Sequence, residues 1–228
     1  LDYVLREMTD DAGGFYSAED ADSLPPERAG DPAAHASEGA FYLWRAAELD
    51  ALLGDDAPLV RRRFGVEAAG NAPVDPQQEF VGRNLLYVAH PIEALSAEFG
   101  RTEQDVMAAL DAARQRLFEV RSRRPRPHRD DKILTAWNGL MIAAFARASR
   151  LSHATAGDAL PPADTYLRAA TQAADFIRSR MWNADSGTLR RRYRDGDAAI
   201  DGYAEDYACL IFGLLELFQA DARPEWLE

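Results

Sequence analysis

Residues 127–139 bring together side chains that could bind a polar ligand and move a proton. The segment holds an imidazole, two carboxylates, an ammonium group, an indole and an amide: His128, Asp130, Asp131, Lys132, Trp137 and Asn138. Lys132 is the only lysine among the 26 lysine and arginine residues of the chain. Because the chain uses arginine for positive charge everywhere else, Lys132 indicates a position that needs a compact ammonium group. The cluster is therefore a candidate site, unless Lys132 simply forms a structural ion pair with one of the two aspartates.

A second acidic group, made of Glu19, Asp20 and Asp22, lies between two expected strands. Repulsion between near carboxylates raises the pKa of at least one of them, which suits acid–base chemistry or cation binding. Glycoside hydrolysis needs two carboxyl groups roughly 5–9.5 Å apart. The second carboxyl group could come from Asp130, Asp131, Asp201, Glu205 or Asp206. Any of these acids could instead cap a helix or hold a loop through backbone N–H groups.

We expect the catalytic residues to come from these acids and the nearby imidazole: His128, Asp130, Asp131, Glu19 and Asp20. Histidine is a common general acid or base near neutral pH. The expected substrate-binding residues are Asp22, Lys132, Trp137, Asn138, Tyr203, Asp206 and Tyr207. In this set the lysine and the asparagine would orient hydroxyl groups. The aromatic rings would stack on the substrate, although such rings are equally common in protein cores.

The same residues give no sign of a metal or cofactor. His128 and Asp130 lack the spacing of a familiar metal-ligand motif, so no metal site is expected. The sequence also lacks a phosphate-binding loop, a dinucleotide-binding fingerprint and a nucleophile elbow. We therefore expect no cofactor and a small-molecule ligand.

Length and composition indicate one globular domain over residues 1–228. The hydrophobic fraction of 47% is enough for a core. The formal net charge of −12 argues against a nucleic-acid partner, because phosphate binding requires a basic surface. No apolar run is long enough to span a membrane. The single cysteine, Cys209, cannot form an internal disulfide and is expected to be buried, which is compatible with a cytoplasmic location.

Apolar residues recur at helical spacing in four segments. The expected helices cover residues 103–119, 133–150, 163–182 and 204–220. Thr102 is the expected N-cap of the first helix. The last helix is apolar on nearly all sides, which predicts that it is buried. Asp201 and Asp206 flank its start and suit capping.

Short aromatic or β-branched runs predict strands. These expected strands cover residues 13–17, 39–44 and 188–193, the last one followed by Asp195-Gly196. Segments with several glycine or proline residues predict loops over residues 24–37, 68–83 and 151–162. Trp44 and Trp182 are expected to lie in the core.

Two parts of the chain repeat the same order of elements. Residues 2–14 resemble residues 175–187, and the start of one expected buried helix, residues 136–140, resembles that of the other, residues 205–210. Repeated helical hairpins of this kind stack on one another. If they close into a ring, the N-terminal ends of the inner helices meet on one face. The repeats therefore predict a mainly α fold of stacked helical hairpins with short β-hairpins in the loops, which would form an (α/α) toroid if the ring closes.

Four groups of residues carry a resemblance to a known family. They are residues 13–23 with 38–44, residues 80–86, residues 127–140, and residues 206–215. Through these matches the chain resembles the spermatogenesis-associated protein family that has an N-terminal thioredoxin-like domain. Residues 24–37 depart from the family pattern, in which the two flanking strand motifs lie closer together.

The resemblance implies an (α/α) barrel similar to six-hairpin glycosidases and to N-acylglucosamine 2-epimerase, next to a thioredoxin-like domain. The chain begins at Leu1 and has no Cys-x-x-Cys motif, so we expect it to be the middle of the barrel part of a longer protein. An incomplete ring would expose the apolar faces of its inner helices, which predicts self-association or a covering partner.

Three functional interpretations follow from these observations. The first is a carbohydrate-active enzyme domain, glycosidase-like or sugar-epimerase-like, with an acidic and aromatic site at the barrel mouth. The second is a non-catalytic scaffold that presents a client to the thioredoxin-like domain. The third is purely structural, in which the polar motifs only lock the helical hairpins together.

Overall fold

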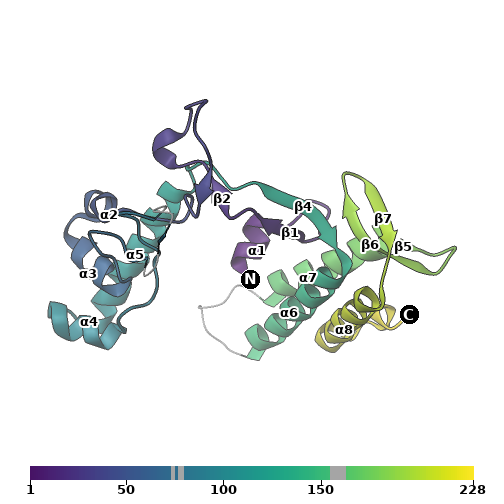
Figure 1. Ribbon diagram of the computed structural model, residues 1–228. Helices are drawn as coiled ribbons and strands as arrows, with labels where there is room; N and C mark the ends of the chain where they lie inside the picture. The colour runs from purple at the N-terminus through teal and green to yellow at the C-terminus, as the bar shows by residue number, and fades with distance from the viewer. Residues whose placement is uncertain (73–74, 77–79, 155–162) are drawn as a thin grey trace. The chain divides into compact units, whose positions relative to one another are not determined.

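The computed structural model describes residues 1–72, 75–76, 80–154 and 163–228, and Figure 1 shows it as a ribbon. Most of its regular structure is helical, which confirms the mainly α prediction. The described residues form two compact units, one made of Leu1–Glu19 with Arg129–Glu228 and the other of Asp20–His128. The prediction of a single domain over residues 1–228 stays a prediction, and so does the toroid.

The unit Asp20–His128 is a small helical body. Its helices are α2 (Ala46–Leu53), α3 (Ala57–Arg63), α4 (Ile92–Phe99) and α5 (Glu103–Arg121), with the 3-10 turns η1 (Pro26–Arg28) and η2 (Gly54–Asp56). Two short strands, β2 (Asp22–Ser23) and β3 (Ser37–Glu38), pair antiparallel before the helices begin. The helices pack a set of fully buried side chains against one another: Leu49, Leu59, Val60, Leu95 and Val106.

The other unit packs long helices beside a sheet. Its helices are α1 (Asp2–Glu7), α6 (Thr135–Ala154), α7 (Ala163–Arg180) and α8 (Ala204–Asp221), followed by the 3-10 turn η3 (Pro224–Trp226). Its strands are β1 (Tyr16–Glu19), β4 (Arg129–Leu134), β5 (Trp182–Asn183), β6 (Thr188–Arg194) and β7 (Asp197–Asp201). The order β1-β4-β6-β5 is antiparallel throughout, and β7 pairs with β6. In Figure 1, α6 lies beside both α7 and α8, in agreement with their contacts.

Helices α6 and α8 approach each other closely at two glycines. A Cβ atom on Gly213 would overlap the carbonyl oxygen of Gly139, and a Cβ atom on Gly139 would overlap the backbone of Cys209. Glycine is the residue that permits such a close backbone approach. The N-terminal ends of the two helices also lie next to each other, because Ala136 N of α6 donates a hydrogen bond to Asp206 of α8.

All four predicted helices form, with changes of up to four residues at their ends. Thr102 caps α5, since its Oγ1 accepts a hydrogen bond from the backbone N of Asp105 at 3.1 Å. The predicted helix over residues 163–182 ends at Arg180. The loop predicted over residues 151–162 is wrong at its start, because no glycine or proline interrupts α6 before it ends at residue 154. Residues 155–162 lie outside the described residues.

The strand predictions are confirmed only in part. The strand over residues 188–193 is confirmed as β6, and Asp195 and Gly196 turn the chain into β7 with φ angles of 51° and 85°. The strand predicted over residues 39–44 is wrong: Tyr42 N donates to Gly39 O at 2.8 Å, which closes a turn instead. Strand β1 begins at Tyr16 rather than at residue 13, because Gly13 is part of a turn and has a φ of 111°.

Several predictions about burial need correction. Helix α8 is not buried on all sides: Ile211, Phe212 and Leu215 are 55%, 39% and 45% exposed. These three residues lie away from the buried side of the helix, where Gly213 faces α6. Exposed apolar residues of this kind agree with the expectation that an incomplete ring leaves apolar helix faces uncovered.

The predicted burial of the two tryptophans and of the cysteine is confirmed only in part. Trp44 is in the core as predicted. Trp182 is not, because it lies on the two-residue strand β5 and is 42% exposed. Cys209 is half-buried rather than fully buried.

Glu216 of α8 joins α6 and α8 through two ion pairs. Its carboxylate side chain is 9% exposed, and its oxygens lie 2.6 Å from Arg147 and 2.6 Å from Arg150 of α6. Hydrogen bonds from Arg147, which has the larger effect, and from Arg150 lower the pKa of Glu216 to about 2. The carboxylate is therefore ionised in the folded state at a pH where an unfolded glutamate would be protonated.

This pKa predicts how stability depends on pH. A glutamate with a lowered folded-state pKa stabilises the fold above its unfolded pKa of about 4.3, and the stabilisation is lost as the pH falls toward 2. Glu216→Gln should lower the free energy of unfolding by about 1–3 kcal/mol at pH 7, and by clearly less at pH 3. Urea denaturation at both pH values measures this. Glu225→Gln, which breaks only an exposed pair with Arg223, is the control. An equal loss for Glu216→Gln at pH 7 and pH 3 would contradict the prediction.

Candidate functional site

Lys132 and Asp130 form an ion pair on strand β4. Alternate residues of a strand point to the same face, so the two side chains lie side by side. The Nζ atom of Lys132 lies 2.6 Å from Oδ2 of Asp130, and the side chains are 35% and 33% exposed. Hydrogen bonding by Lys132 lowers the pKa of Asp130. An aspartate held ionised in this way suits charge stabilisation better than proton donation.

Asp131 contacts an arginine of the neighbouring strand. Its Oδ1 lies 2.7 Å from Nε of Arg194 on β6, and the same Nε lies 3.5 Å from a carboxylate oxygen of Asp195. The described residues give neither Oδ1 of Asp131 nor Nε of Arg194 a well-aligned hydrogen bond. The contact is therefore a close charge pair without directional bonding, and the catalytic role of Asp131 stays a prediction.

Strand β1 places Glu19 next to β4. In the register of the two strands, Ala18 is opposite Asp130 and Glu19 is opposite Arg129. The Glu19 carboxylate accepts a hydrogen bond from the hydroxyl of Tyr3 on α1. The structure thus brings Glu19 and Asp130 onto adjacent strands, each already paired with another side chain.

Three further candidates, Asp20, Asp22 and His128, belong to the unit Asp20–His128. All three are exposed. The carboxylate of Asp20 accepts a hydrogen bond from the backbone N of Asp22 at 3.1 Å, and the backbone N of Asp20 donates to His128 O at 2.8 Å. These contacts hold a local turn, and the roles expected of the three side chains in catalysis and binding stay predictions.

Asn138 is a buried bridge between segments that are far apart in the sequence. Its side chain is on α6, and the residue is 1% exposed. Its Nδ2 donates to Phe15 O and to Leu134 O, both at 2.9 Å, while its Oδ1 accepts from Phe15 N at 2.8 Å. Both N–H groups of the amide are occupied by the fold, so these contacts account for the asparagine without a ligand.

Asp206 ties the starts of α6 and α8 together. This residue is 1% exposed. One carboxylate oxygen accepts from Ala136 N at 3.3 Å, and the other accepts from Tyr203 N at 2.9 Å and from Arg191 at 3.0 Å. The bond to Tyr203 N is part of a capping box, which confirms the expectation that Asp206 suits capping. Asp201, by contrast, pairs with Arg190 on β6.

Two large aromatic side chains lie exposed at the same helix starts. Trp137, directly after Ala136, is 54% exposed, and Tyr203 is 60% exposed. The guanidinium of Arg191 lies 4.8 Å from the centre of the Tyr203 ring. Tyr207 is different, because it is half-buried and its hydroxyl accepts a hydrogen bond from Leu189 N at 2.9 Å. Trp137 and Tyr203 are therefore the predicted stacking residues that the structure leaves available to a ligand.

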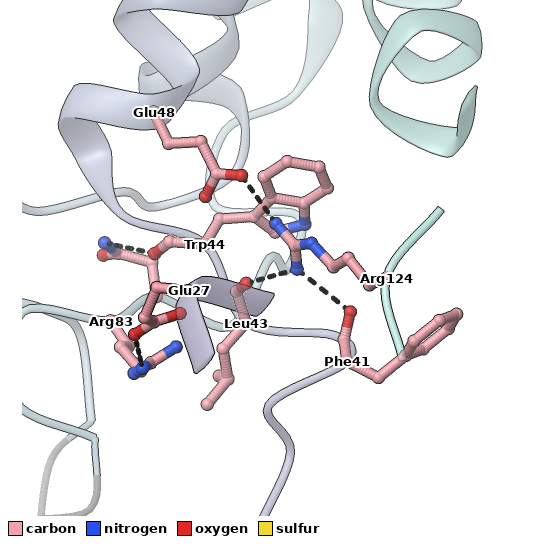
Figure 2. Close-up of polar contacts among 8 residues, drawn as sticks. Glu27, Phe41, Leu43, Trp44, Glu48, Arg83 and Arg124 are labelled. Atoms are coloured by element: carbon pink, nitrogen blue, oxygen red, sulfur yellow. Dashed lines mark hydrogen bonds and ion pairs between the residues drawn. The ribbon is translucent and has the colours of Figure 1, made fainter. Parts of the chain in front are cut away.

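A buried arginine in the other unit was not singled out by the sequence. Figure 2 shows Arg124 donating to the carbonyl oxygens of Phe41 at 3.0 Å and Leu43 at 2.7 Å, and to the Glu48 carboxylate at 2.9 Å. Its guanidinium lies 3.9 Å from the centre of the Trp44 ring, and the residue is 7% exposed. A single arginine among many carries no sequence signal for such burial.

Nearby, Arg83 pairs with Glu27 at 2.5 Å, as Figure 2 also shows. Since Arg83 and Arg124 are satisfied by protein groups, we interpret both as structural.

The described residues contain neither a metal-binding cluster nor a membrane-spanning helix. Within the described ranges, no cluster of three or more His, Cys, Asp or Glu side chains is arranged to hold a metal ion. No described helix has the length and apolar composition needed to cross a bilayer.

Comparison with known proteins gives a consistent result over the whole chain. No family model matches. The chain is 36% identical over 248 residues to spermatogenesis-associated protein 20 of Homo sapiens and 37% identical over 250 residues to that of Rattus norvegicus, covering 100% of this chain in both cases. An uncharacterized protein of Caenorhabditis elegans is 31% identical over 241 residues, or 98% of this chain. The chain spans about 30% of the length of these relatives. It is therefore homologous, from end to end, to one section of spermatogenesis-associated protein 20.

Proposed function

We propose that this chain is part of a carbohydrate-active domain, in which the starts of α6 and α8 bind a sugar. In this proposal the domain is an (α/α) toroid of the glycosidase or sugar-epimerase type. It works in the cytoplasm, next to a thioredoxin-like domain of the longer protein. The observation that carries the proposal is the exposure of Trp137 and Tyr203 at two helix starts that share one buried carboxylate, that of Asp206.

The exposed rings support sugar binding for a physical reason. Trp and Tyr side chains gain most when their large apolar surface is covered, and Tyr also offers a polar group at its edge. The carboxylate of Asp206 fixes the backbone around both rings, so they do not have to be ordered when a ligand binds. A preorganised pair of aromatic faces suits the flat apolar faces of a sugar ring.

The charged groups support particular roles in this proposal. Asp130, which Lys132 keeps ionised, would stabilise positive charge rather than donate a proton. Proton donation would fall to another of the predicted acids or to His128. Arg191 is held by Asp206 against the Tyr203 ring and would present its remaining N–H groups to sugar hydroxyls.

A second candidate function is the non-catalytic client-binding scaffold. It is favoured by the apolar side chains exposed along α6 and α8 beyond the helix starts, which are Leu140, Ile211, Phe212 and Leu215. An exposed apolar surface of this kind is common where a protein binds another polypeptide. The two candidates differ in ligand, since the first requires a sugar and the second a peptide chain.

Substitution of the two rings tests the sugar-binding proposal. We expect Trp137→Ala to weaken sugar binding at least about tenfold, or about 1.4 kcal/mol, with a smaller loss for Tyr203→Ala, because each removes one stacking face. Isothermal titration against a panel of mono- and disaccharides measures the affinity. Trp182→Ala is the matched control, since Trp182 is an exposed indole of the same unit that lies on β5.

The outcomes separate the two candidates. Sugar binding that is lost in Trp137→Ala and kept in Trp182→Ala supports the proposal. Absence of binding to every sugar by a folded sample, together with binding of unfolded polypeptide, would favour the scaffold.

A further inference from the structure

Residues 85–89 form an extended segment that is anchored at its start in the unit Asp20–His128. The anchor is Asn84, which is fully buried and exchanges two backbone hydrogen bonds with Trp44, at 2.7 and 3.0 Å. Its side chain also holds Glu67, accepting from the backbone N at 2.8 Å and donating to the carbonyl O at 3.1 Å. After Asn84 the chain forms no helix, turn or paired strand until residue 90.

One edge of this segment is used by the fold. Leu85 N donates to Oδ1 of Asn71 at 2.9 Å, Tyr87 N to Phe64 O at 3.4 Å, and Ala89 N to Arg63 O at 2.9 Å. Because the backbone groups of successive residues in an extended chain point to opposite edges, the alternate residues present theirs on the other side.

The other edge is open. Its N–H and C=O groups belong to Leu86 and Val88, and neither N–H makes an intramolecular hydrogen bond within the described part of the chain. An edge of this kind is a template for pairing with another extended chain. Its two free donors, spaced two residues apart, match the acceptors of one antiparallel or parallel strand.

Exposed apolar side chains lie on and near this segment. Val81, Leu85, Tyr87 and Val88 are 61%, 60%, 53% and 64% exposed, although they lie within eight residues of one another. An open hollow of about 490 Å³ adjoins the segment and is lined by Tyr87 and Ala89 on one side and by other apolar residues, Pro58, Val66 and Phe99. The segment therefore offers free main-chain groups at one edge and exposed apolar surface for side chains of a partner.

The charged residues around the hollow indicate the sign of the charge that a partner would carry. Arg61 pairs with Asp50 at 3.1 Å and Arg62 pairs with Glu98 at 2.9 Å, so both cations are neutralised. Glu67 also lines the hollow, is exposed, and its carboxylate has no ion pair among the described residues. With a net charge of −12 for the whole chain, the uncompensated charge here favours a basic partner.

We propose that residues 85–89 accept an extended peptide of a partner protein as an added β-strand. The peptide is apolar at alternate positions and carries a lysine or arginine for Glu67. Its main chain pairs with Leu86 and Val88, and its side chains cover Leu85 and Tyr87. This mode of recognition takes affinity from main-chain hydrogen bonds and specificity from the neighbouring pockets. The segment belongs to the unit Asp20–His128, and the proposal does not rest on the proposed sugar site.

A fluorescent peptide, N-acetylated Val-Lys-Val-Lys-Val amide, tests the proposal with the 228-residue chain. We expect saturable binding by fluorescence anisotropy and at least a tenfold slower hydrogen exchange at the Leu86 and Val88 amides.

We expect the Val88→Pro variant to bind the peptide at least tenfold more weakly. The substitution removes one outward N–H group that the fold does not use, and it keeps the preceding residue extended. Val88→Ala, which keeps the N–H, should retain most of the affinity. Glu67→Gln should weaken binding of this peptide severalfold but leave the serine version, Val-Ser-Val-Ser-Val, unchanged.

Three results would overturn the proposal. The first is peptide binding without protection of the Leu86 and Val88 amides, a measurement that needs no variant and so does not depend on how Val88→Pro folds. The second is no binding of the peptide to a folded sample. The third is a concentration-dependent dimer in sedimentation that Val88→Pro abolishes, because it would show that a second copy of the chain occupies the edge.

Discussion

Gly213→Ala should lower the free energy of unfolding by about 2–3 kcal/mol, although alanine is the better helix former by about 1 kcal/mol. The sign is reversed because the added Cβ would overlap the carbonyl oxygen of Gly139 in the neighbouring helix. A backbone atom cannot move aside as a flexible side chain can, so α6 and α8 would have to separate. Separation would also stretch the ion pairs of Glu216 and the hydrogen bond that Ala136 N donates to the Asp206 carboxylate.

The matched control is Ala208→Gly on the exposed side of the same helix. It changes helix propensity in the opposite direction without a clash, and should cost no more than about 1 kcal/mol. Urea denaturation followed by circular dichroism at 222 nm measures both variants. A Gly213→Ala protein as stable as the wild type would show that the crossing tolerates a side chain and that the closeness of the helices is not a constraint.

The four long helices were predictable because their apolar residues recur every three to four residues, which is the period of an α-helix. Val106, Leu110, Ala113 and Leu117 follow one another at intervals of about one turn, and all four are buried on α5. Strand β4 was missed for the opposite reason: four of its six residues are charged, so no alternation of apolar and polar residues marks it. The short helices α2 and α4 lie where no helix was predicted, although each has a buried leucine.

The sequence could point to candidate site residues, but it could not show most of the contacts that those residues make. The sequence pointed to Lys132 and anticipated that it could pair with Asp130, which the structure shows. It also anticipated that Asp206 caps a helix. It could not tell which aromatic residues stay exposed, because Trp137 and Tyr207 occupy similar positions in the two helices and only tertiary packing buries the second.

The same limit applies to Asn84 and Asn138. Both are buried asparagines that use an amide to hold a distant backbone segment, Asn84 through Glu67 and Asn138 through Phe15. A sequence shows an asparagine as a residue that favours turns or polar sites. Its use as a bridge depends on which segment packs against it, and that is decided by the whole fold.

Arg124→Lys should destabilise the unit Asp20–His128 by about 2–4 kcal/mol, although the positive charge is kept. The guanidinium of Arg124 serves two carbonyl oxygens and the Glu48 carboxylate at once while it stacks on the Trp44 ring (Figure 2). A lysine ammonium is not planar and cannot combine the fork of hydrogen bonds with a stacked ring. At least one carbonyl oxygen of Phe41 or Leu43 would lose its partner in a buried position, and an unsatisfied buried polar group costs about 1–3 kcal/mol.

Hydrogen exchange separates this effect from changes elsewhere in the chain. We expect faster exchange in α2 and α5, which flank the arginine, and unchanged exchange in α6, α7 and α8, which belong to the other unit. Arg123→Lys is the matched control, because Arg123 is the preceding residue and is exposed. If Arg123→Lys accelerates exchange in α5 as much as Arg124→Lys does, the buried fork is not what stabilises this unit. If only Arg124→Lys does so, one arginine holds the turn at residues 39–44 against the helices that follow it.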